Sequence, residues 1–219
     1  MRPLISLGVA LVLVASPATR AADAWQDLPA SLQLEAMADS LRMNGTPMSI
    51  RAFHSRVPAE VLIQEVQAAW GRNPRHGPVQ RSSIPKWMVL NQTVGEQHRS
   101  FQVRDQGGGA GGYVAVTSPK ETVEPRLVLR LPALVSPLQV VDSVDQGKAS
   151  QQVMAVSRRS VDATAAALNE ALKAQRWERA SMKKQGDVVR LSANRGGEQF
   201  DAILSGQKNG ALVMINTVK

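Results

Sequence analysis

Two short matches recur at one spacing along this chain of 219 residues. Ser55-Arg56 returns as Ser157-Arg158, and Gly95-Glu96-Gln97 returns as Gly197-Glu198-Gln199, each 102 positions further on. Self-similarity at a fixed spacing is the signature of repeated structural units. We therefore expect two small tandem lobes, an internal repeat with an offset of 102. The alternative is that the same stretches belong to one larger α+β sheet.

The first expected lobe, residues 46–120, has the pattern of a strand, a helix and three strands. Met48–Arg56 alternates between apolar and polar residues, which is typical of a strand. Pro58 suits the first turn of a helix, and apolar spacing continues as an amphipathic helix over about 58–70. The three further strands are expected at Trp87–Val94, Ser100–Arg104 and Tyr113–Thr117. The expected order is β-α-β-β-β.

The second expected lobe, residues 151–219, repeats this order with cleaner signals. Gln152–Ser157 alternates as a strand, and Ser160 is a candidate N-cap for the helix that follows. One apolar stripe at helical spacing is formed by Val161, Ala165, Leu168 and Leu172. Strands are expected at Val188–Ala193, Gln199–Ser205 and Ala211–Val218. The fold class is therefore α+β, with two β-α-β-β-β lobes.

Two segments flank these lobes. Residues 22–45 show helical spacing at Leu34, Met37 and Leu41, which predicts an amphipathic helix docked on a lobe. Residues 121–150 form a proline-containing connector. Its short apolar runs, Arg126–Leu131 and Leu138–Val141, predict edge strands that join the lobes, because a free tether would be polar.

The first 21 residues predict export. A short positive start precedes the apolar run Leu4–Ala15, and small residues follow, which is the order of a secretory signal peptide. Cleavage is expected after Ala21, with Ala18 as the second choice. The apolar run is shorter than the roughly 20 residues of a membrane span, so we expect a bacterial periplasmic or secreted protein without a stable span after cleavage. A retained N-terminal anchor is the alternative.

Charge favours an anionic partner. The chain carries 26 Lys and Arg against 18 Asp and Glu, a formal net charge of +8, and residues 46–120 and 151–219 each carry +5. The stretch 72–86 has four cations and no acid and is followed by Trp87. Candidate contacts to an anionic ligand are Arg72, Arg75, Arg81 and Lys86. The alternative is an ordinary solvated loop.

No motif predicts an enzyme. Cysteine is absent, which excludes disulfides and thiolate chemistry, and the three histidines show no metal-ligand spacing. Ser181 and Lys184 form an S-x-x-K pattern, but its companion motifs are missing, so a cell-envelope hydrolase is only an alternative. No catalytic residue, metal or cofactor is nominated.

A glycine-rich stretch follows the second strand expected after the first helix. It lacks the residues that complete a phosphate-binding loop, so it predicts a flexible hairpin loop able to clasp a partner. The glycines concerned are Gly107, Gly108, Gly109, Gly111 and Gly112.

Together these patterns favour an exported bacterial accessory protein that binds a protein of a secretion, pilus or envelope assembly. Sheet edges available for strand addition would serve that role. Binding of an anionic envelope polymer or a nucleic acid through the basic lobes is the alternative.

Overall fold

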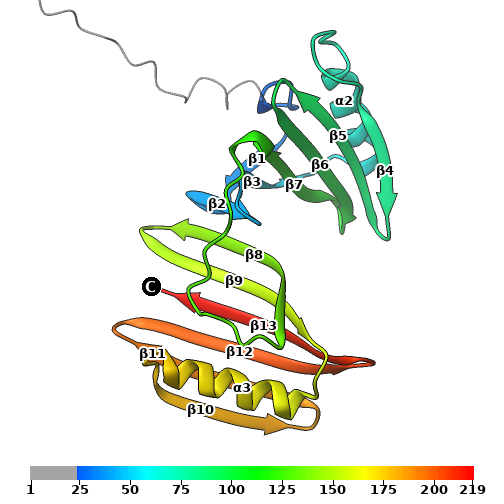
Figure 1. The fold of residues 1–219 in the computed structure, drawn as a ribbon. Coiled ribbons are helices and arrows are strands. Elements are labelled where there is room, and N and C mark those ends of the chain that lie inside the picture. Colours follow the sequence, from blue (N-terminus) through cyan, green and yellow to red (C-terminus); the bar gives the residue numbers. More distant parts are fainter. Residues whose placement is uncertain (1–23) are drawn as a thin grey trace, which may run out of the picture.

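The structure, a computed structural model, describes residues 24–219, so the expected signal peptide lies outside the described residues. Within the described residues the chain is mostly antiparallel sheet with two complete α-helices, which makes its class α+β or mostly β. Figure 1 shows two groups of strands, with α2 beside one and α3 beside the other. We call them the N-terminal half, residues 24–117, and the C-terminal half, from residue 135.

The N-terminal half contains one helix, α2 (Ala59–Trp70). Its strands are β1 (Gln33–Ala36), β2 (Ser40–Met43), β3 (Thr46–Ser55), β4 (Gln80–Ile84), β5 (Trp87–Val94), β6 (Gln97–Gln106) and β7 (Gly109–Thr117). A short 3-10 helix, η1 (Pro119–Glu121), begins the connector. Helix α2 buries its apolar side, which includes Trp70, against Phe53 and Phe101 of the sheet.

The C-terminal half contains one helix, α3 (Val161–Ala174). Its strands are β8 (Val135–Asp145), β9 (Lys148–Ser157), β10 (Glu178–Gln185), β11 (Val188–Arg195), β12 (Glu198–Gln207) and β13 (Gly210–Val218). Ser160 caps α3 as expected, since its hydroxyl accepts a hydrogen bond from the Ala163 amide. Leu168 and Leu172 face a second, separate core.

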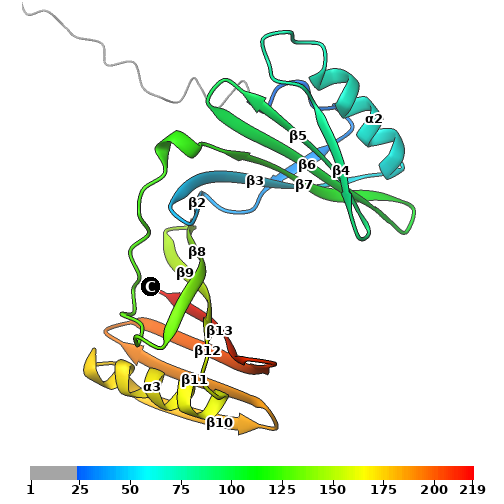
Figure 2. The ribbon, with the colours of Figure 1, turned by 45° about the vertical axis from the view of Figure 1, so that its right-hand side comes forward.

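The strands join in one continuous sheet of order β10-β11-β12-β13-β9-β8-β2-β3-β7-β6-β5-β4, with β1 added to the edge of β3. The two halves meet where β2 pairs antiparallel with β8, and this pairing covers only four residues of each strand. Figure 2 shows the halves as two bodies connected at this narrow point and by the chain between β7 and β8.

Arg99 fastens the beginning of the described chain to the N-terminal core. Its side chain is buried and lies 4.1 Å over the ring of Trp70. Nη1 donates to the Gln26 carbonyl at 3.1 Å, and Nε donates to Oε1 of Gln92 at 2.9 Å. Burial lowers the pKa of Arg99 to about 10, because the charged form loses its hydration.

The expected amphipathic helix in residues 22–45 is wrong. This segment forms β1 and β2 instead, and Leu34 packs on the N-terminal core while Met37 is exposed. The apolar spacing fits a helix by count, but the open edge of β3 offers backbone partners along Arg51–His54. Strand pairing therefore decides the conformation.

Besides β1 and β2, two further strands were not expected. Each half has four strands after its helix rather than three, because β4 and β10 precede the expected ones. Every residue of both strands is exposed, so neither carries an apolar alternation. They are recognisable only as backbone partners of β5 and β11.

The connector and the glycine-rich stretch also differ from expectation. Leu138–Val141 lies in a strand as expected, but this strand, β8, is paired on both sides, by β9 and β2, and is not an edge strand. Arg126–Leu131 forms no strand and instead buries Leu129 in the C-terminal core. Gly109–Gly112 is part of β7, so only Gly107 and Gly108 form the turn. A Cβ at Gly112 would lie 1.9 Å from the Gln102 carbonyl oxygen, so glycine here permits close strand packing.

Candidate functional site

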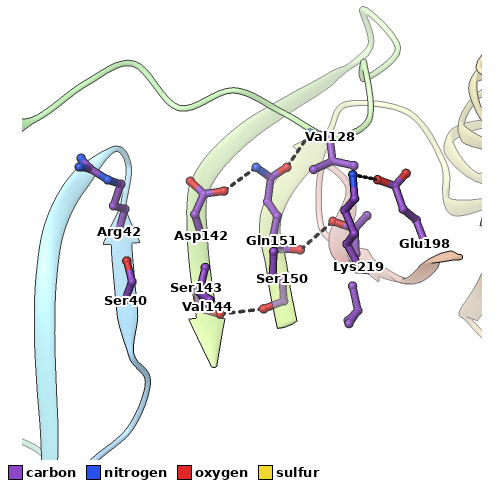
Figure 3. Close-up of a pocket in the computed structure, with 13 residues that line it drawn as sticks. Ser40, Arg42, Val128, Asp142, Ser143, Val144, Ser150, Gln151, Glu198 and Lys219 are labelled. Carbon is purple, nitrogen blue, oxygen red and sulfur yellow. Dashed lines mark hydrogen bonds and ion pairs between the residues drawn. The ribbon is translucent and has the colours of Figure 1, made fainter. Parts of the chain in front are cut away.

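A groove of about 330 Å³ lies where the two halves meet, and we call it the junction groove. It is built from β2, parts of β8, β9 and β13, the first residue of β12 (Glu198), the C-terminal Lys219, and one connector residue, Val128. Figure 3 shows these side chains around the groove. Its lining residues are Ser40, Arg42, Val128, Asp142, Ser143, Val144, Ala149, Ser150, Gln151, Glu198, Thr217, Val218 and Lys219.

A buried glutamine organises one wall of this groove. Gln151 donates through Nε2 to Asp142 Oδ1 at 2.7 Å and to the Arg126 carbonyl at 2.8 Å. Its Oε1 accepts from the Val128 amide at 2.9 Å, as Figure 3 shows. One side chain thereby holds both the connector and a groove carboxylate in place.

Charges of both signs frame the groove. Arg42 of β2 stands opposite Asp142 of β8 in the strand register and donates through Nη1 to the Gly45 carbonyl at 2.9 Å. At the other end, Lys219 Nζ lies 3.4 Å from Glu198. Hydrogen bonds from Arg195 hold the pKa of Glu198 below its ordinary value, and Lys219 acts in the same direction. Glu198 is therefore a carboxylate at neutral pH.

Accessible apolar side chains lie between these charges. Val128 and Val144 are 38% and 37% exposed, and Ala149 is also exposed. Ser40, Ser143, Ser150 and Thr217 add hydroxyl groups to the lining. The arrangement is suited to accepting an apolar side chain between charged rims.

The four basic residues proposed as anion contacts lie on and around β4. Arg72 and Arg75 lie before β4, and Lys86 lies at the turn after it. Arg81 is engaged by Glu60 of α2 at 2.9 Å. This hydrogen bond lowers the pKa of Glu60 and keeps the carboxylate charged. One of the four proposed contacts is therefore already paired with a carboxylate.

The serine and lysine of the S-x-x-K pattern point to opposite faces of the sheet. Ser181 Oγ lies 2.7 Å from Ser192 Oγ, whereas Lys184 forms an ion pair with Asp162 of α3 at 2.7 Å. Side chains of a strand alternate between faces, so Lys184 cannot take a proton from Ser181. Across residues 24–219, no three His, Cys, Asp or Glu side chains are grouped closely enough to hold a metal ion.

Exposed apolar side chains occupy the sheet face that α2 and α3 leave open. In the N-terminal half, Trp87 and Tyr113 stack with centroids 5.2 Å apart, and Arg104 lies 4.7 Å over Trp87. In the C-terminal half, Ile203 and Met214 stand opposite each other and are 49% and 45% exposed. The alternation of apolar and polar residues along a strand defines two faces without saying which one a helix covers. These residues could therefore not be recognised as an exposed apolar surface from the sequence.

The junction groove was also missed, since its residues come from five separate parts of the chain. No sequence signal links them; only the pairing of β2 with β8 brings them together. None of the described helices is both long enough and apolar enough to cross a membrane.

Comparison with known proteins gives one structural match. No family model and no curated protein matches the chain. The apo structure of the immunity protein TplEi of T6SS from Pseudomonas aeruginosa superposes with a TM-score of 0.30 and 10% sequence identity. The overlay covers 88% of this chain and 83% of that one, and a TM-score this low does not establish a common fold.

Proposed function

We propose that this chain is an exported bacterial envelope protein that binds another protein, and that the partner inserts an apolar side chain into the junction groove. The observation that carries the proposal is the groove itself, an accessible and largely apolar cavity to which both halves contribute. A volume of about 330 Å³ suits one or two large side chains. The charged residues at the two ends of the groove would orient the partner segment that carries these side chains.

We further propose that the two halves are copies of one ancestral lobe, with 46–120 and 151–219 as their main parts. The N-terminal hairpin turn, Asn44-Gly45, has φ values of 49° and 77°, and its counterpart, Gln146-Gly147, has 49° and 76°. Both turns begin a strand, helix and four strands. Up to the helices, equivalent positions of the two halves are 102 residues apart, since β3 and β9 begin at Thr46 and Lys148. After the helices the spacing is 101 residues, since β5 and β11 begin at Trp87 and Val188.

Two details at the helix starts support this equivalence. The Ser55 hydroxyl accepts a hydrogen bond from the Val57 amide, and the Ser157 hydroxyl accepts one from the Arg159 amide, each at 3.1 Å. The Ser-Arg match at 102 is thus supported structurally. The Gly95-Glu96-Gln97 match is one residue out of register, because Gln97 is equivalent to Glu198.

The junction has the symmetry expected of two paired copies. Leu41 of β2 stands opposite Ser143 of β8, and these positions are themselves 102 apart. An antiparallel pair centred on equivalent residues is what a local twofold axis generates. The groove then lies at the contact between copies, where neither copy alone could form it.

A variant pair tests the groove. Val144→Arg places a long charged side chain in the groove at an exposed position, and Ile203→Arg makes the matched change on the open sheet face. Affinity capture from envelope extracts of cells that encode the chain should recover the same protein with the native chain and with Ile203→Arg, but not with Val144→Arg. Calorimetry with the purified partner should then show a loss of at least ~10-fold for Val144→Arg alone. Loss with Ile203→Arg alone would refute the groove and move the site to the open face.

Export is tested separately. Mass spectrometry of the protein recovered from the periplasm or the medium should find Ala22 at the N-terminus, or Thr19 if cleavage follows Ala18. A cell-bound chain that begins at Met1 would contradict the proposed localisation.

A further inference from the structure

The two halves differ in what lies over their first hairpin. The turn of the β2–β3 hairpin is buried at Gly45, whereas the turn of the β8–β9 hairpin is exposed at Gly147. A Cβ at Gly45 would overlap the Val123 carbonyl oxygen, but a Cβ at Gly147 would meet no atom within 4 Å. A segment of the chain therefore covers the first turn, and no described residue covers the second.

The covering segment is the start of the connector, residues 119–123. The Val123 amide donates a hydrogen bond to the Gly45 carbonyl at 3.2 Å. The hydroxyl oxygens of Thr122 and Thr46 lie 2.8 Å apart. The connector therefore crosses the β2–β3 hairpin along a defined course, held through both its backbone and a side chain.

The strand end from which this segment starts recurs beside the junction groove. The Ser118 amide, just after β7, donates to the Pro47 carbonyl at 3.0 Å, and the Lys219 amide, just after β13, donates to the Ala149 carbonyl at 2.8 Å. These two hydrogen bonds join equivalent positions of the two halves. Lys219 and Ala149 both line the junction groove, and Figure 3 labels Lys219 there.

The lining of the junction groove also matches the surface that holds the connector. Arg42, which donates to a connector carbonyl at 3.4 Å, has Val144 as its equivalent. Gln97, whose Nε2 donates to the Ser118 hydroxyl at 3.2 Å, has Glu198 as its equivalent. Val144 and Glu198 both line the groove. The groove is therefore the open counterpart of a place that a peptide segment fills in the N-terminal half.

One position beside the groove adds an unneutralised charge. Lys148 is exposed and is the equivalent of Thr46. Asp145 stands opposite Lys148 in the strand register, but within residues 24–219 Lys148 forms neither an ion pair nor a side-chain hydrogen bond. A segment on the connector's course would face this cation with the residue that takes the place of Thr122. A carboxylate is the complementary group there.

We propose that the junction groove binds a short acidic segment of the protein partner, and that this segment crosses the β8–β9 hairpin as residues 119–123 cross β2–β3. Its backbone passes over Gly147, an acidic side chain faces Lys148, and an apolar side chain enters the groove beside Val144. This inference rests on the proposed function, since it specifies the segment that the same groove accepts. It adds a contact with the hairpin turn, which the proposed function does not need.

The first test uses amide NMR of the full chain, titrated with a synthetic peptide. The peptide has the sequence of residues 118–124 with the change Thr122→Glu, so it copies the connector and carries the complementary carboxylate. We expect saturable shifts at Gly147, Lys148 and Ala149. The absence of saturable shifts at this hairpin overturns the proposal.

Gly147→Ala is the most specific variant. Its methyl group meets no atom of the free chain, but it stands where the crossing backbone would pass, as Val123 passes Gly45. Peptide binding should weaken at least ~10-fold. Gly186→Ala is the matched control, since Gly186 also has a positive φ and an open Cβ position, and it should leave binding unchanged. Binding by Gly147→Ala as tight as that by the control overturns the proposal.

A charge exchange tests the acidic residue. The native chain should bind the Thr122→Glu peptide at least ~3-fold more tightly than a Thr122→Lys peptide, and Lys148→Glu should reverse this preference. Lys208→Glu changes an exposed cation of the same half that does not line the groove, and it should leave the preference in place. A preference that both variants change equally reflects net charge and overturns the proposal.

The purified protein partner separates this inference from the proposed function. Loss of partner binding with both Val144→Arg and Gly147→Ala supports the two together. Loss with Val144→Arg alone leaves the proposed function in place and overturns the course over the hairpin. Binding that neither variant weakens refutes both. Recovery of the chain itself as the bound protein would mean that a second copy occupies the groove, which also overturns this proposal.

Discussion

Adding one methyl group at Gly109 or Gly210 should destabilise one half of the molecule and spare the other. A Cβ would lie 2.1 Å from the Ser55 carbonyl oxygen in the first case and 1.9 Å from the Ser157 carbonyl oxygen in the second. Cβ atoms do not approach other atoms within 3.0 Å, so the backbone must move by about 1 Å. In the Gly109 variant that movement separates β3 from β7 at their end pair, Ser55 and Ala110. In the Gly210 variant it separates β9 from β13 at their end pair, Ser157 and Ala211.

The overlap sets the expected loss in the free energy of unfolding. Overpacking by one methyl group lowers this free energy by about 1–3 kcal/mol, and we expect about 3 kcal/mol because rigid backbone lies on both sides of the added group. For a unit of 60–100 residues, that lowers the melting temperature by roughly 12–24 °C. Gly95→Ala and Gly186→Ala are matched controls, since both glycines have φ near 60° and no atom within 4 Å of the added Cβ. These two control substitutions should lower the free energy of unfolding by only about 1–2 kcal/mol, which is the penalty for an alanine in the left-handed conformation.

Hydrogen exchange read by mass spectrometry, in increasing urea, resolves the two halves in one experiment. Gly109→Ala should lower the unfolding midpoint of peptides from residues 46–117 and leave those from 148–218 unchanged, and Gly210→Ala should do the reverse. If Gly210→Ala costs no more than Gly186→Ala, the inferred close approach is wrong. If either variant lowers both midpoints equally, the two cores unfold as one unit and the reasoning from separate cores fails.

Three further predictions concern buried or junction contacts. Arg99→Met should lower the free energy of unfolding in urea by about 1–3 kcal/mol, because it leaves the buried Gln92 oxygen without its donor. Arg99→Lys should be worse, since it keeps the buried charge and loses the fork of donors; the opposite order would contradict this account. The pKa of Glu198 is lower in the folded than in the unfolded chain, so its stabilising effect is present above pH about 4.5 and disappears as pH falls through the folded value. The stability difference between the native chain and Glu198→Gln should therefore shrink below pH 4.5, and a constant difference would refute the coupling to Arg195. Finally, Asn44→Gly removes the acceptor of a 2.8 Å hydrogen bond from the Val140 amide of β8, and glycine tolerates the φ of 49° found there. This variant should widen the distance distribution between fluorophores on the two halves without lowering the melting temperature of either by more than ~4 °C.

The parts of the fold that the sequence predicted correctly are those with a buried face. The helix expected at about 58–70 begins at Ala59 and ends at Trp70, because the apolar spacing that identified it is the surface that packs on the core. The expected strands correspond to β3, β5 to β7, β9 and β11 to β13 for the same reason. The missed strands β4 and β10 are exposed at every residue and so leave no such signal.

The candidate sites were less accessible to sequence reasoning. Arg72, Arg75, Arg81 and Lys86 are close in sequence, yet β4 separates the first two from the last and Glu60 engages Arg81. Conversely, Lys208 lies 49 positions after Arg159, and only the strand order places both at one cavity. Closeness in sequence therefore says little about which basic side chains line one cavity.

The sequence by itself determined which segments around each core are amphipathic, where the helices start, and that both halves are basic. These properties are local, since they depend on the spacing of apolar residues within about a dozen positions. Tertiary structure alone decided that residues 33–43 pair as strands, which sheet face stays uncovered, and how β2 meets β8. Those outcomes depend on backbone hydrogen bonds and cavities between segments up to 107 residues apart, such as Asp39 and Gln146. Local periodicity carries no information about such pairs.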